Sequence, residues 1–272
     1  MKWIVDLDGV VYRGQELLPG AVEFFQCVRA LGQPSVVVTN NSTLPVDDYV
    51  KRLADWGIGV TSQQVVTSAL AAAHYLLRHG IRGPVLAIGE AGLTRALDQA
   101  GLVFISGDEA AGDEPFEAVV VGLDRRFDYR KLELACRWVR RGARFVGTNP
   151  DAVLPTENGQ LRPGCGSLLA AIQAASGVQP VVVGKPYPDI MHLALERLGQ
   201  GPAPSPDVVV VGDRLDTDVE AARRMGLASA LVLTGVTTPE QVSGLGADRP
   251  DYVFRDLAHL TEVLLRPRLT GA

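Results

Sequence analysis

The sequence predicts an α/β protein: a parallel sheet that carries the site, with a second α/β unit inserted into it. First, short β-branched runs alternate with amphipathic segments, as in the strand–helix–strand units of parallel sheets. Second, this alternation restarts around Arg82-Gly83-Pro84 and returns near Gly184. Third, 272 residues are enough for two such units. We therefore expect residues 1–81 and 182–272 to form one domain and residues 82–181 to form the insert.

The first strand lies at the start of the chain, where Lys2-Trp3-Ile4-Val5 is a short, mostly apolar run. It is followed by Asp6 and Asp8, which lie on one face of an extended chain, and then by Gly9, which allows a tight turn. Two carboxylates this close repel each other unless a cation such as Mg²⁺ lies between them. A solvated turn is the alternative for an isolated Asp-x-Asp pair. An EF-hand is a poorer match because Val10 stands where an oxygen ligand is needed.

The remaining elements follow from periodicity, from β-branched runs and from Gly and Pro punctuation. In the first unit we expect a helix over 21–31, a strand over 35–38 and a helix over 46–56. In the insert we expect strands over 85–88, 118–121 and 143–147, and helices over 91–100, 129–140 and 168–175, after which residues 180–183 lead into Gly184-Lys185-Pro186. After the insert we expect helices over 189–198 and 257–265, strands over 208–211 and 230–233, and a helix directly after Asp218.

Composition and charge exclude several classes of protein. The chain is 47% hydrophobic with a net charge of −5, which disfavours binding to nucleic acid or to a membrane surface. Its three cysteines lack metal-ligand spacing, so we expect reduced thiols rather than disulfides or a zinc site. We find no signal peptide and no apolar stretch long enough to span a bilayer. We therefore expect a cytoplasmic protein.

Polar side chains follow three of the predicted strands. They are Asp6 and Asp8, Thr39 and Asn40, and Asp213 and Asp218, with Lys185 before a helix nearby. Because the carboxyl ends of parallel strands share one edge of a sheet, we expect these groups to converge there. Taken singly, each residue has another explanation. Lys185 could be a surface lysine, and Thr39 could cap the end of a strand. Asp213 and Asp218 could favour the start of the next helix through its dipole. Taken together and in this order, they indicate one site.

The chemistry that such a set supports is phosphoryl transfer. Asp6, Asp213 and the backbone carbonyl of Asp8 can bind Mg²⁺, while Thr39 and Lys185 can hold a phosphate. The Asp8 side chain can protonate the leaving oxygen and later deprotonate water. A free aspartate has a pKa of about 3.9, so this role requires a raised pKa in the folded protein.

The combination resembles the haloacid dehalogenase superfamily, specifically subfamily IIA with its NagD-like, nitrophenylphosphatase, phosphoglycolate phosphatase and pyridoxal phosphatase members. The resemblance rests on Asp6-Leu7-Asp8-Gly9-Val10-Val11-Tyr12, Val38-Thr39-Asn40-Asn41-Ser42, Gly184-Lys185-Pro186, and Gly212-Asp213-Arg214-Leu215-Asp216-Thr217-Asp218. In the insert, Gly147-Thr148-Asn149-Pro150-Asp151 and Pro163-Gly164-Cys165-Gly166-Ser167 also resemble that subfamily's cap. It implies a Rossmann-like parallel-sheet core with an inserted α/β cap domain.

The resemblance also implies roles for individual residues. Asp6 would form a phospho-aspartyl intermediate, with Asp8 as acid and then base. Thr39, Lys185 and the backbone N–H of Asn40 would hold phosphate. Asp213 would bind Mg²⁺, and Asp218 would support the metal site without binding the metal directly.

The resemblance implies a Mg²⁺-dependent phosphomonoesterase that forms a homodimer through its caps. We expect its substrate to be a small metabolite: phosphoglycolate or a glycerol, nucleotide, sugar or pyridoxal phosphate, with nitrophenyl phosphate as a generic substrate. We expect the cap to select it through Arg125, Arg126 and the loop 149–158, including Asn149 and Asp151. Two alternatives remain: phosphotransfer to an acceptor other than water, and a non-catalytic, receiver-like binding protein.

Overall fold

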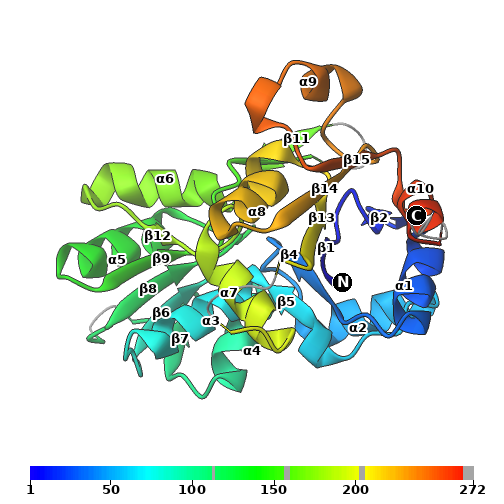
Figure 1. Cartoon of the computed structure of the whole chain (residues 1–272). Coiled ribbons are helices and arrows are strands. Elements are labelled where there is room, and N and C mark those ends of the chain that lie inside the picture. The colour runs from blue at the N-terminus through cyan, green and yellow to red at the C-terminus, as the bar shows by residue number, and fades with distance from the viewer. Residues whose placement is uncertain (112–113, 156–159, 202–205, 266–272) are drawn as a thin grey trace.

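Two parallel β-sheets form the framework of the molecule (Figure 1). The computed structural model describes residues 1–111, 114–155, 160–201 and 206–265. The first sheet has six strands in the order β15-β14-β13-β1-β4-β5, all paired in parallel. Its strands are β1 (Lys2–Asp6), β4 (Ser35–Thr39), β5 (Val65–Thr67), β13 (Val208–Gly212), β14 (Ala228–Val232) and β15 (Tyr252–Phe254).

Helices cover both faces of this sheet, because alternate residues of each strand point to opposite sides. In β1, Trp3 and Val5 pack with α1 (Ala21–Ala30), α2 (Val46–Asp55) and α10 (Leu257–Leu265). Ile4 points to the other face, toward α3 (Ser68–Arg78), α7 (Pro188–Arg197) and α8 (Glu220–Met225). β1 lies between β13 and β4, so the acidic residues at its end lie near the middle of the sheet's carboxyl edge.

The second sheet has five strands in the order β12-β9-β8-β6-β7, also all parallel. They are β6 (Val85–Ile88), β7 (Phe104–Ser106), β8 (Ala118–Val121), β9 (Arg144–Gly147) and β12 (Val181–Val182). One face is covered by α5 (Tyr129–Arg140) and α6 (Cys165–Ser176), at the left of Figure 1. The other face packs with α3 and α4 (Ala91–Gln99), and one hydrophobic cluster continues through α3 into the first sheet.

The predicted fold class is confirmed, as are most of the predicted elements. The division into residues 1–81 with 182–272 and residues 82–181 stays a prediction, and β12 crosses the second of those junctions. The three cysteines are free and buried. Within the described part of the chain, no helix is long and apolar enough to cross a membrane.

Several elements were missed by the sequence interpretation, mostly because they are too short to show a period. These are the hairpins β2–β3 (Tyr12–Arg13, Glu16–Leu17) and β10–β11 (Val153–Pro155, Leu161–Pro163), the strands β5, β7 and β15, and the short helices η1 (Ser62–Gln64), α9 (Pro239–Ser243) and η3 (Gly246–Asp248). The longest omission is α3, which is apolar around most of its circumference and so shows no amphipathic stripe. The sequence does mark its start, because threonine is a preferred N-cap residue and Thr67 directly precedes the helix. In the structure the Thr67 hydroxyl accepts a hydrogen bond from the Leu70 N–H at 3.2 Å.

Two boundaries also differ from the prediction. The helix α6 begins at Cys165 rather than at residue 168. Directly after Arg214 the chain forms a π-helical turn, η2 (Leu215–Val219), before the α-helix α8 begins. Short π-helical turns occur often at functional sites.

Candidate active site

The carboxyl ends of strands from both sheets border one cleft of about 790 Å³. From the first sheet, the cleft is lined by the loops that follow β1, β4, β13 and β14. From the second sheet, it is lined by the loops that follow β8 and β9. Parallel sheets bind ligands at this edge, and here two such edges contribute to the same cleft.

An acidic cluster lies in this cleft. Asp6, Asp213 and Asp218 each offer an oxygen within 4.8 Å of the others, and all three are buried. Asp213 Oδ2 accepts a hydrogen bond from the Val236 N–H at 2.7 Å, whereas its Oδ1 has no partner among the described residues. Carboxylate oxygens are the preferred ligands of Mg²⁺. The donor set and the unpartnered oxygen of Asp213 therefore fit this cation, and Asp6 and Asp213 meet as predicted.

The Lys185 ammonium balances part of this negative charge. It is buried between Asp6, with which it forms an ion pair, and Asp218, whose Oδ1 lies 2.7 Å away. Burial alone lowers the pKa of Lys185, but the two carboxylates outweigh it and raise the pKa above its usual value. The second oxygen of Asp218 accepts a hydrogen bond from the Arg214 N–H at 3.2 Å. Asp218 is thus engaged on both sides and holds Lys185 in place.

Asp6 and Asp213 have raised pKa values. Burial raises the pKa of Asp6 well above its usual value, although Lys185 opposes the shift. Burial and the neighbouring Asp218 raise the pKa of Asp213 to about 7. Without a cation, Asp213 therefore titrates near neutral pH.

Asp8 and Thr39 lie on the open side of the cluster. The Asp8 side chain is exposed to the cleft, and the surrounding protein raises its pKa by desolvation. The Thr39 hydroxyl lies 3.4 Å from Asp8 Oδ2 and accepts a hydrogen bond from the Asn41 N–H at 3.1 Å. These residues meet beside Lys185, as the order of the strands predicts.

Two glycines keep room for Asp213. Gly9 has a φ of +83°, and a Cβ there would lie 2.5 Å from Asp213 Oδ2. At Gly235 a Cβ would lie 1.7 Å from the same oxygen. The sequence interpretation missed Gly235, although it follows the predicted strand over 230–233 and so had to lie at this edge. A carboxylate packed this closely cannot accept an added methyl group without moving.

We therefore expect Gly235→Ala to weaken Mg²⁺ binding by about 10- to 100-fold, the usual effect of disturbing the groups that orient a ligand. Titrating activity with Mg²⁺ measures this change. Gly244→Ala is the matched control, since the nearest atom to a Cβ there is 4.0 Å away and its φ is −90°. Equal Mg²⁺ affinity in both variants would contradict the assignment.

The residues predicted to select substrate are distributed unevenly. Arg125 lines the cleft, but its guanidinium binds Glu90 Oε2 at 2.7 Å. The prediction that Arg126 contacts the substrate is corrected, because Arg126 is not among the residues that line the cleft. Its guanidinium pairs with Asp108 at 2.6 Å, and 78% of its side chain is exposed. Asn149 and Asp151 do line the cleft, and residues 156–158 of their loop lie outside the described residues.

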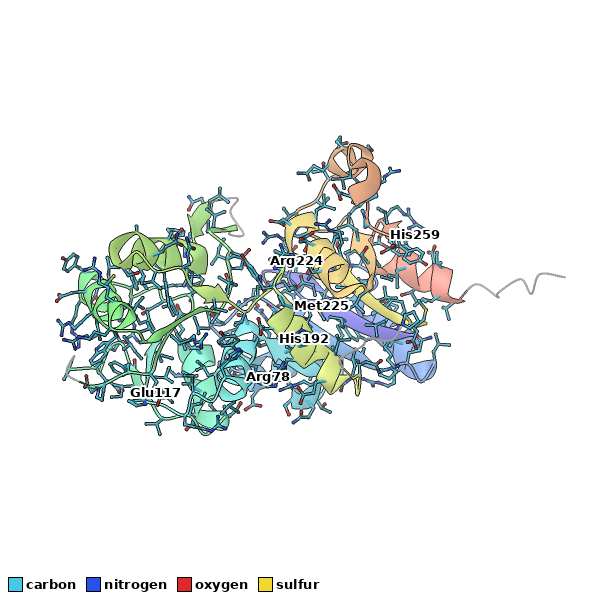
Figure 2. The ribbon with its side chains drawn as sticks, turned by 60° about the vertical axis from the view of Figure 1, so that its left-hand side comes forward. Arg78, Glu117, His192, Arg224, Met225 and His259 are labelled. Carbon is cyan, nitrogen blue, oxygen red and sulfur yellow. The ribbon has the colours of Figure 1, made fainter. Side chains whose placement is uncertain are left out.

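Besides Arg214, the cleft contains two further arginines to which no role was assigned from the sequence. Arg13, on β2, donates to the Thr234 carbonyl, and Arg162 lies on β11. Both lie on hairpins whose strands have only two or three residues, which is too short to show an alternating pattern in the sequence. No histidine is among the cleft-lining residues of the described chain. Figure 2 shows His192 and His259 on separate helices, α7 and α10.

Known proteins share both this fold and this sequence. The family model of haloacid dehalogenase-like hydrolases matches residues 3–103, and a second model, described as HAD-hydrolase-like, matches residues 182–260. An acid sugar phosphatase of Staphylococcus aureus is 39% identical over 255 residues, which is 94% of each chain.

Solved structures agree with this result. The p-nitrophenyl phosphatase of Archaeoglobus fulgidus has a TM-score of 0.86 and 36% identity, covering 96% of this chain and 98% of its own. A glycerol phosphate phosphatase of Mycobacterium tuberculosis, solved with magnesium, has a TM-score of 0.83 and 37% identity, covering 97% of this chain and 78% of its own.

The fold, the acidic cleft and these matches define a hydrolase class, and the chain belongs to the haloacid dehalogenase-like hydrolases. Its relatives are of the NagD and 4-nitrophenylphosphatase type, that is, subfamily IIA.

Proposed function

We propose that this protein is a Mg²⁺-dependent phosphomonoesterase that hydrolyses small phosphorylated metabolites. The observation that carries this proposal is the cluster of Asp6 and Asp213 with one uncommitted buried oxygen, next to Lys185 and Thr39. A metal, a cation for the phosphate and a hydroxyl donor are the groups that phosphoryl transfer requires. Bound Mg²⁺ would neutralise the charge that develops on the phosphate oxygens.

In this proposal Asp6 is the nucleophile. One of its oxygens attacks phosphorus, and the bond from phosphorus to the leaving alkoxide breaks as a phospho-aspartate forms. The carboxylic acid of Asp8 gives its proton to that alkoxide, and the resulting carboxylate then takes a proton from the water that cleaves the phospho-aspartate. Thr39, Lys185 and the N–H of Asn40 hold the phosphate oxygens. The ion pair with Lys185 supports the ionised form of Asp6 that the attack needs.

The relatives support the substrate class. Their names specify sugar phosphate, nitrophenyl phosphate and glycerol phosphate, which share a phosphate ester and little else. A cleft of about 790 Å³ has room for esters of this size. We propose that Arg125 and Asn149 border the part of the substrate beyond the phosphate.

Removal of the metal tests the proposal. With Mg²⁺ the protein should release equal amounts of inorganic phosphate and alcohol from nitrophenyl, glycerol and sugar phosphates. Chelation should reduce the rates by about 10²- to 10³-fold, because a metal contributes several kcal/mol to such a transition state. Activity that survives chelation would overturn the proposal. Nitrophenol release without equal phosphate release, when an alcohol is present, would indicate phosphotransfer instead.

The Mg²⁺ requirement should depend on pH. Because the pKa of Asp213 is raised to about 7 in the metal-free protein, Mg²⁺ has to displace a proton at lower pH. The apparent affinity should therefore fall as pH is lowered from about 8 to about 6, approaching a tenfold loss per pH unit below the pKa. Mg²⁺ activation curves at several pH values measure this, and a constant activation midpoint would contradict it.

Three further expectations belong to this proposal. We infer that residues 82–181 act as a cap over a core made of residues 1–81 and 182–272. We also propose, from the family resemblance, a homodimer formed through the caps, which a monomeric mass in light scattering would exclude. Cytoplasmic location stays a prediction.

A further inference from the structure

Asp151 links the second sheet to the first. It follows β9, yet both of its carboxylate oxygens bind side chains from loops of the first sheet. Oδ1 accepts a hydrogen bond from Arg214 Nη1 at 3.0 Å, and Oδ2 accepts one from Asn40 Nδ2 at 3.2 Å. Only 9% of the Asp151 side chain is exposed, against 30% of the Arg214 side chain, so the carboxylate is the shielded partner of this ion pair.

The contact between Asp151 and Asn40 leads to Lys185. The Asn40 carboxamide binds both backbone groups of Lys185: its Oδ1 accepts from the N–H at 2.7 Å and its Nδ2 donates to the C=O at 2.9 Å. Asn40 thus holds the backbone of the lysine whose ammonium lies between Asp6 and Asp218. The packing is close, because a Cβ at Gly184 would lie 2.7 Å from Asn40 Oδ1.

The contact between Asp151 and Arg214 leads to the acidic cluster. Arg214 directly follows Asp213, and its backbone N–H binds Asp218 Oδ2 at 3.2 Å. Asn149 strengthens the same junction, since its Nδ2 donates to the Asn40 carbonyl at 2.8 Å and its Oδ1 accepts from the Asp151 N–H at 3.1 Å. The Asp151 carboxylate is therefore hydrogen-bonded both to Asn40, which holds Lys185, and to Arg214, which follows Asp213.

We propose that Asp151 is a positioning residue, which acts through Asn40 and Arg214 to hold Lys185 and Asp213 in the geometry that phosphoryl transfer needs. Direct contact with substrate is the alternative expected from the sequence. Both oxygens of Asp151 are already occupied, however, and a carboxylate would repel a phosphorylated substrate. The inference rests on the proposed function for its activity readout.

Kinetics on three substrates separate the two roles. Asp151→Ala should lower kcat by about 30- to 100-fold for nitrophenyl, glycerol and sugar phosphate alike, since a displacement near 1 Å can reduce a rate 10²-fold. KM should change by less than about threefold, because Asp151 does not touch the substrate. Asp151→Asn should fall between the wild type and the alanine variant, as its single amide oxygen can accept from only one of the two donors.

A double-mutant cycle and a matched control complete the test. Asn40→Ala should cause a loss similar to that of Asp151→Ala, and the double variant should lose no more than about threefold beyond either single variant, because both act on Lys185. Asp216→Asn is the control: it removes another carboxylate partner of Arg214, at 2.8 Å, without touching Asn40. It should leave kcat within about twofold of the wild type.

The outcomes are distinct. A loss confined to one substrate, a loss expressed mainly in KM, additive effects in the cycle, or an equal loss in Asp216→Asn would each overturn the positioning role. If the wild type hydrolyses none of the phosphates with Mg²⁺, the proposed function fails instead. Calorimetric binding of orthovanadate with Mg²⁺ then decides the inference, because vanadate mimics the transition state of phosphoryl transfer. Asp151→Ala is expected to bind it about tenfold more weakly than the wild type, and Asp216→Asn is expected to bind it as the wild type does.

Discussion

Replacing Asp6 with asparagine is expected to reduce phosphate ester hydrolysis by about 10⁴-fold or more, the scale seen when a covalent nucleophile is removed. The neutral amide is a poor nucleophile, and it also removes a carboxylate from the metal cluster. Lys185 keeps Asp218 as a partner at 2.7 Å, so the variant should still fold. Steady-state hydrolysis of nitrophenyl phosphate measures the loss, and thermal unfolding checks the fold.

The covalent step can be checked separately. Rapid acid quenching of the wild type during turnover should trap phosphate on a peptide that contains Asp6, and the asparagine variant should trap none. Asp55→Asn, an exposed aspartate at the end of α2, is the control and should behave as the wild type. Activity of the Asp6 variant within tenfold of the wild type would exclude Asp6 as the nucleophile.

Replacing Asp8 with alanine is expected to lower turnover by about 10²- to 10⁴-fold, the usual contribution of a general acid and base. The Asp8 side chain is exposed to the cleft and its pKa is raised, which favours the protonated form that a general acid needs. Mg²⁺ affinity should change little, because the proposed metal ligand from Asp8 is its backbone carbonyl, which alanine retains.

Leaving groups distinguish this role from a structural one. Nitrophenolate leaves readily without a proton, whereas the alkoxide of glycerol needs one. In single-turnover experiments, formation of the phospho-enzyme should therefore slow much more for glycerol phosphate than for nitrophenyl phosphate. Equal slowing of that step for both substrates would indicate that Asp8 acts in another way.

The sequence predicted the site best where the chemistry follows a strongly patterned strand. The apolar runs of β1 and β13 predict buried parallel strands, and Asp6 and Asp213 lie at the ends of these strands. Lys185 and Thr39 were found by the same reasoning. The prediction was weaker for α3, whose apolar surface hides its period, and for strands of two or three residues such as β2 and β11. Such short strands have too few residues to show an alternating pattern, and they form because of their tertiary contacts.

What the sequence determined by itself is the alternation of strands and helices, and therefore the one edge at which Asp6, Asp8, Thr39 and Asp213 had to meet. Such information is local, because strand formation and chain direction depend on neighbouring residues. The tertiary structure alone decided which partners these residues have: the N–H of Val236 on Asp213, the two bonds of Asp151 to the first sheet, and the position of Arg126 outside the cleft. These contacts depend on how two sheets pack through α3, and packing is a property of surfaces that no single stretch of the chain contains.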